Sequence, residues 1–106
     1  MRNRRHTTVL LAALIALGFS AGCARYSTVS HEAYQYSKAL YSVCNRQDEP
    51  RLTMVAEQIE TARAAQQLQK TEADWLTDIV ATAQAGDWQD ASKDARRLME
   101  AQVVKN

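Results

Sequence analysis

Only one glycine and one proline follow Cys23 in this 106-residue chain, at Gly86 and Pro50. Alanine, glutamine, leucine and charged residues are abundant over the same stretch, and that composition favours helices and disfavours strands. With so few chain breakers, the connections between helices must be short, and short connections join antiparallel neighbours. The sequence therefore predicts an all-α fold, a small antiparallel three- or four-helix bundle.

Two helices are expected in the first half of this region, because apolar residues recur there at spacings of three and four. The first spans about His31–Arg46, with Ser30 as its N-cap. The second begins after Asp48, with Pro50 in its first turn where a missing amide costs nothing. It continues toward Gln69 and is expected to be the longest of the helices.

Two further helices are expected in the second half. Thr71 with Asp74 three residues later is a variant of the capping box and predicts the start of a third helix, which Gly86 ends. Asp87 then caps a fourth helix that runs to about Gln102. The side chains expected to face the core are Ala33, Tyr36, Leu40, Val43, Cys44, Leu52, Val55, Ile59, Ala62, Trp75, Leu76, Ile79, Val80, Ala83, Trp88, Ala91, Ala95 and Leu98.

The third and fourth helices resemble one hairpin of the tetratricopeptide repeat family. The resemblance is carried by Trp75, by Gly86-Asp87-Trp88 at the turn and by Ala91. Ala95 stands where that family places an aromatic residue, and a second copy of the repeat is not visible. Because a single repeat cannot form a solenoid, an ordinary helical hairpin is the expected structure.

The N-terminus carries an export signal. Met1–His6 is basic and Val9–Phe19 is an uninterrupted apolar run, the n-region and h-region of a signal peptide. Ser20-Ala21-Gly22-Cys23 resembles the lipobox of bacterial lipoproteins, although Ser20 stands where leucine is usual. The resemblance implies a signal peptide over residues 1–22, a lipidated cysteine and short tether over 23–30, and a helical domain over 31–106.

Two other interpretations of the same segment remain open. An ordinary secretory signal would be cut near Gly22 or Ala24, and an uncleaved anchor would use the uncharged stretch Thr7–Ala24, whose length is at the lower limit for a span. All three interpretations export the domain. In lipoproteins, an aspartate after the lipidated cysteine retains the protein in the inner membrane; Ala24 occupies that position and favours the outer membrane, where the organism has one.

Charge excludes one class of partner. Removing residues 1–22 leaves 84 residues, enough for one small domain. Three of the 13 basic residues, Arg2, Arg4 and Arg5, lie in the signal, which leaves 10 basic side chains against 12 acidic ones. The basic side chains are scattered, so nucleic-acid binding is not expected.

Catalytic or metal-binding chemistry is not apparent. His31 has no second ligand at a suitable spacing, so neither a metal nor another cofactor is expected. The aspartates at 87, 90 and 94 alternate with Lys93 and Arg97 and indicate a solvated helix face. Without a nucleophile and base arrangement or a phosphate loop, the chain is not expected to be an enzyme.

Two features leave an interaction role open. Cys44, unpaired once Cys23 is lipidated, is either a small buried hydrophobe or the source of an intermolecular disulfide. Tyr34 and Tyr41 share a face with Lys38 between them, and they either cover the edge of the core or contact headgroups or a partner.

These features together predict a non-catalytic lipoprotein of the cell envelope. Acylated Cys23 would hold it on a membrane, because two or three acyl chains anchor stably where one does not. The helical domain would contact an unknown envelope protein or associate with itself. The alternative is a structural tether resembling small murein-type lipoproteins, in which a lysine at the very C-terminus is joined to the cell wall; here Lys105 is followed by Asn106.

Overall fold

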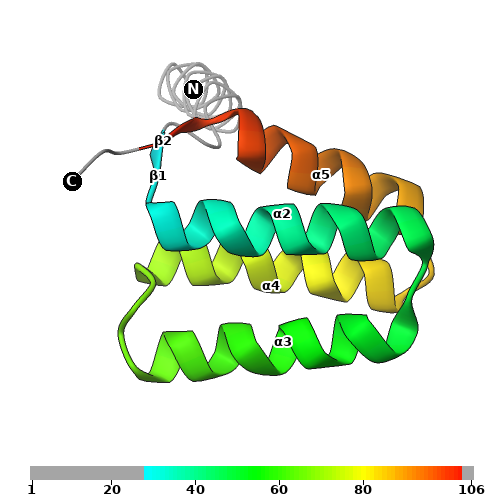
Figure 1. Cartoon of the computed structure of the whole chain (residues 1–106), viewed down its shortest axis with the longest axis horizontal. Helices are drawn as coiled ribbons and strands as arrows, with labels where there is room; N and C mark the ends of the chain where they lie inside the picture. The colour runs from blue at the N-terminus through cyan, green and yellow to red at the C-terminus, as the bar shows by residue number, and fades with distance from the viewer. Residues whose placement is uncertain (1–27, 104–106) are drawn as a thin grey trace, which may run out of the picture.

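The computed structural model of the chain describes residues 28–103, which form four α-helices and one two-stranded ladder (Figure 1). The helices are α2 (His31–Arg46), α3 (Glu49–Ala64), α4 (Lys70–Gln84) and α5 (Trp88–Glu100), and the strands are β1 (Thr28–Val29) and β2 (Gln102–Val103). The expectation of a small all-α bundle is confirmed. Within the described residues, no helix is both long and apolar enough to cross a membrane.

Successive helices run in opposite directions, so α2 and α4 point one way and α3 and α5 the other (Figure 1). Helices α2 and α4 each pack against all three of the other helices. Because α2 and α4 are parallel, their N-termini lie at the same end of the bundle, a fact that matters for the contacts of Glu72 below.

The three connections between helices share one backbone pattern. Each helix is followed by a residue with positive φ, which is 53° at Gln47, 57° at Gln66 and 91° at Gly86. The amide of the next residue then donates to the carbonyl five residues back, as Asp48 N does to Val43 O at 3.1 Å. A residue in the left-handed conformation after a helix allows the next amides to hydrogen-bond the last free carbonyls of that helix. The same conformation reverses the direction of the chain within a few residues.

The positive φ at Gln66 also corrects one boundary. We expected the second helix to reach Gln69 and to be the longest, but it ends at Ala64 and has 16 residues, the same length as α2. Glutamine rarely adopts a left-handed conformation, so the sequence gives little warning of the turn.

The start of the third helix was also predicted wrongly. Thr71 does not cap α4; the N-cap is Gln69, and Glu72 is the residue three positions on whose carboxylate accepts from Gln69 N at 3.2 Å. The other helix starts agree with expectation, since Ser30 Oγ accepts from Ala33 N and Asp48 Oδ1 accepts from Arg51 N. Asp87 occupies the N-cap of α5 without a hydrogen bond from its side chain to the helix.

A short parallel ladder, which we did not predict from the sequence, joins the two ends of the described chain. Thr28 pairs with Gln102 and Val29 with Val103, so the last helix stops at Glu100 rather than Gln102. Val29 is buried, and the packed domain therefore includes Thr28–Ser30, which we had assigned to the tether.

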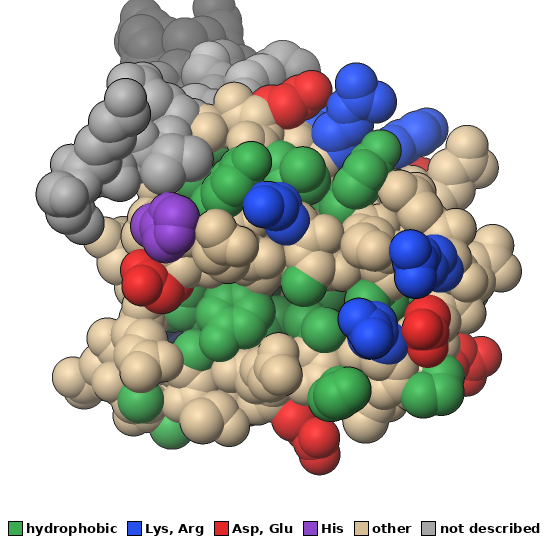
Figure 2. Space-filling view, viewed as in Figure 1, with side chains coloured by type: hydrophobic (Ala, Val, Ile, Leu, Met, Phe, Trp, Pro, Cys, Tyr) green, Lys and Arg blue, Asp and Glu red, His purple; other side chains and the backbone are tan. Residues whose placement is uncertain are grey.

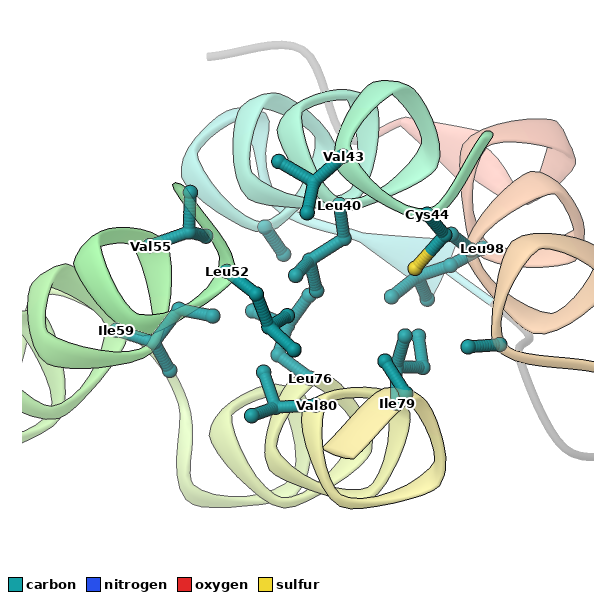
Figure 3. Close-up of a cluster of buried hydrophobic side chains, with 14 of the residues drawn as sticks. Leu40, Val43, Cys44, Leu52, Val55, Ile59, Leu76, Ile79, Val80 and Leu98 are labelled. Carbon is teal, nitrogen blue, oxygen red and sulfur yellow. The ribbon is translucent and has the colours of Figure 1, made fainter. Parts of the chain in front are cut away.

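The core is apolar and draws on every helix. Figure 3 shows Leu40, Leu52, Leu76 and Leu98, one from each helix, directed into the interior. Most side chains expected in the core are buried, but Tyr36, Trp75 and Trp88 are only partly buried and pack against its edge. Their size and polar atoms keep one side of each ring at the surface.

Candidate functional site

A shallow groove runs between α2 and α3. On the face shown in Figure 2, hydrophobic side chains gather in a hollow along the middle of the molecule. The volume of the groove is about 350 Å³, which accommodates side chains rather than a whole helix. Its lining residues come from two helices, namely Gln35, Lys38, Ala39, Ser42 and Val43 from α2, and Arg51 and Val55 from α3.

The floor of the groove follows from the packing of the two helices. Val43 and Val55 are buried core residues on the side of the interior where α2 and α3 adjoin (Figure 3), and Ala39 is partly buried beside them. A small alanine between larger neighbours leaves space that a leucine would fill. The bottom of the groove is therefore apolar and continuous with the hydrophobic core, whereas its sides are polar.

The rim of the groove is cationic. Lys38 is exposed, with its Nζ 5.4 Å from the centre of the Tyr34 ring, and Arg51 is exposed and pairs with Asp48 at 4.0 Å. No carboxylate stands among the residues that line the groove. An apolar floor under two positive charges is suited to a ligand that is apolar on one side and acidic on its flanks.

Met54 extends this apolar surface. Its side chain is 49% exposed, the only large hydrophobic one so exposed among residues 28–101, whose side chains are described. On α3 it stands three residues after Arg51 and next to Val55, so it lies on the flank of the helix that borders the groove. A flexible thioether at a rim adapts to different contact shapes.

The other side of α3 is closed by an ion-pair network with α4. Arg63 Nη1 donates to Asp74 Oδ1 at 3.1 Å and Nη2 donates to Thr77 Oγ1 at 2.9 Å, while Lys70 Nζ donates to Asp74 Oδ2 at 3.0 Å. The hydrogen bonds from Lys70 and then Arg63 lower the pKa of Asp74 below its ordinary value, and the bond to Asp74 raises the pKa of Arg63. The Nε of Arg63 is buried without a hydrogen-bond partner and lies 3.5 Å from Glu60.

Asp74 thus stabilises the folded state only when it is ionised. Its pKa is lowered on folding, so its contribution is present above the pKa of the unfolded chain and is lost as the pH falls through the folded-state value. We had expected Asp74 to take part in a capping box with Thr71, and the sequence alone did not reveal Arg63 as its partner eleven residues away.

Cys44 is a buried hydrophobe, as one of our two interpretations expected, and only 2% of it is exposed. Burial disfavours the thiolate and raises the pKa of this thiol from 9.0 to about 11. A sulfur at this depth cannot reach a second chain unless the bundle opens locally, which removes support for an intermolecular disulfide in the folded state.

The raised pKa of Cys44 predicts a loss of stability in alkali. Below pH 9 both folded and unfolded chains hold the thiol proton, whereas between pH 9 and about 11 only the unfolded chain releases it. The free energy of unfolding should therefore fall over this range, by about 3 kcal/mol in full. Urea unfolding at pH 8 to 11 measures it. Cys44→Ala removes this component, so parallel curves for the two proteins would contradict the assignment.

The other residues singled out from the sequence are not brought together into a site. Tyr34 and Tyr41 are partly buried and pack against the core, as expected for residues that cover its edge. Asp94 pairs with Arg97 at 3.5 Å along the same helix, and His31 is exposed near Gln35. Over residues 28–103, no group of three or more histidine, cysteine or acidic side chains is arranged to hold a metal.

Cys23, the predicted lipidation site, lies outside the described residues. Comparison of the chain with protein-family models, with curated proteins and with solved structures finds no match. The groove was not identified from the sequence, because Ala39, Ser42 and Arg51 follow no motif. One feature of the sequence could have indicated the groove. Small or basic residues stand beside the predicted core positions of α2 and α3.

Proposed function

We propose that this protein is a lipid-anchored, non-catalytic helical module of the cell envelope that acts by contact with another envelope component. One observation carries the proposal: the ladder of β1 with β2 brings both ends of the described chain to one end of the bundle (Figure 1). The lipobox cysteine lies only five residues before Thr28, so an anchor there would hold this end within about 20 Å of the membrane.

Such an anchor would leave the flanks of the bundle free for contact. The axes of the helices extend away from the end of the bundle that carries the ladder (Figure 1). The groove lies between α2 and α3, along the side of the bundle rather than at the end that the anchor would hold. The groove supports a binding role because it combines an apolar floor with charged residues at its edge. By resemblance, Ala24 after the cysteine favours the outer membrane where the organism has one.

Intact mass spectrometry of the detergent-extracted protein tests the anchor. The expected species begins at Cys23 and carries the added mass of two or three acyl chains, and Cys23→Ala should lose all acyl mass. Cys44→Ala is the matched control, because it removes the other cysteine and should leave acylation intact. A full-length or unacylated wild-type chain would refute the lipoprotein and support an uncleaved anchor or free secretion.

The alternative, a structural tether joined to the cell wall, is favoured by no contact within residues 28–103. Lys105, the residue nearest to the attachment position of that class, lies outside them. Covalent recovery of the protein with purified peptidoglycan would support the tether, and its complete absence there would exclude it.

A further inference from the structure

The positive charge around the groove between α2 and α3 favours a negatively charged ligand. Lys38 and Arg51 are the charged residues of the lining, and both are cationic. Asp48 is paired with Arg51, yet the Arg51 side chain remains 61% exposed and keeps donors available to a second carboxylate. Lys38 has its ammonium over the Tyr34 ring, a contact that leaves its three donors free to bind an anion.

A second copy of this chain is a poor occupant. Two copies anchored in one membrane would be related by a two-fold axis along the membrane normal, which places equal surfaces at equal heights. In an interface with the groove on the axis, one groove would face the other, and two pairs of cations would meet without a matching carboxylate from the lining. Juxtaposed like charges oppose association.

We propose that the groove binds an acidic amphipathic helix of a partner protein, with apolar side chains in the floor and carboxylates on Lys38 and Arg51. Helix-in-groove recognition reads apolar anchors at three- and four-residue spacing, and the floor of Ala39, Val43 and Val55 receives such anchors. Met54 at the edge adds apolar contact area. This inference deepens the proposed function, since it names the chemistry of the partner.

The probe is a synthetic helical peptide of leucine and glutamate with leucines along one face, compared with a peptide in which lysine replaces every glutamate. The full chain is placed in neutral phosphatidylcholine nanodiscs, and binding is followed by peptide fluorescence anisotropy and by amide chemical shifts. The glutamate peptide should bind and shift the amides of Ala39, Val43 and Val55, and the lysine peptide should not. Affinity for the glutamate peptide should fall as salt is added.

Charge reversal supplies the matched variants. The double variant Lys38→Glu with Arg51→Glu should lower the affinity for the glutamate peptide by roughly tenfold or more. Lys93→Glu with Arg96→Glu makes the same charge change at exposed positions of α5 and should alter the affinity less than about twofold. Circular dichroism establishes that both variants keep the helical fold.

Three outcomes would overturn the proposal: no binding of the glutamate peptide, equal binding of both peptides, or equal weakening by the two charge reversals. Concentration-dependent pairing of the protein without peptide, with shifts at the same amides, would identify a second copy as the occupant and also overturn it. None of these outcomes affects the acyl mass at Cys23, so failure here is distinguishable from failure of the lipid anchor.

Discussion

Replacing Glu72 with alanine is expected to lower the free energy of unfolding by about 3 kcal/mol, although glutamate is usually a surface residue. Only 2% of Glu72 is exposed. Its Oε2 accepts from Ser30 N at 2.6 Å, and its Oε1 accepts from Ser30 Oγ at 2.9 Å and Gln69 N at 3.2 Å. One carboxylate therefore caps α4 and also fixes the residue that caps α2.

The parallel arrangement of α2 and α4 explains why a buried carboxylate is tolerated. Both helices present their N-termini at the same end of the bundle, and the positive end of each helix dipole favours a negative charge there. Removal of the carboxylate leaves three donors without their acceptor, and each part-buried donor costs about 1 kcal/mol or more. The contact also connects Ser30, which precedes α2, to the start of α4.

Chemical denaturation measures the effect, with Glu57→Ala on the exposed face of α3 as the matched control at less than about 0.5 kcal/mol. Ser30→Ala should cost about 1 kcal/mol, and the double variant should cost less than the sum of the two, because each single change already removes the hydrogen bond from Ser30 Oγ to Glu72 Oε1. If Glu72→Ala destabilised no more than Glu57→Ala, the shared cap would not contribute to stability.

Leu40→Ala is expected to cost about 3 to 4 kcal/mol. Leu40 is fully buried on α2, which packs against all three other helices, so the substitution opens a cavity in the core that the helices share. A domain of this size has a total stability of about 5 to 8 kcal/mol, and its melting temperature should fall by about 15 to 25 °C.

Thermal melting followed by circular dichroism at 222 nm tests this prediction. Met54→Ala removes a similar apolar volume from an exposed position and should cost less than about 1 kcal/mol. Similar losses in the free energy of unfolding for the two changes would mean that Leu40 is not buried in the core.

The helices themselves followed from local sequence. The range His31–Arg46 and the caps Ser30 and Asp48 were predicted correctly, because apolar periodicity and capping are properties of neighbouring residues. The errors fall where distant residues compete with local preference. Glu72 rather than Thr71 organises the start of α4, since its carboxylate also reaches Ser30, which is 42 positions away in the chain.

The candidate groove likewise depends partly on local sequence and partly on how the helices pack. The burial of Val43 and Val55 could be predicted from helical periodicity, but the space between them depends on how closely α2 and α3 pack. Lys38 and Arg51 belong to different helices, and only the turn between those helices brings both to one rim. A linear pattern does not encode the distance between two helix faces.

The sequence by itself determined the helical class, the number of helices to within one, most of the inward faces and the prediction of a lipid anchor at Cys23, because each depends on residues within a few turns of one another. Tertiary structure alone decided the pairing of Thr28–Val29 with Gln102–Val103, the shared cap at Glu72 and the groove between α2 and α3. Each of these joins residues from different elements, and the energy of such contacts exists only after the helices have packed.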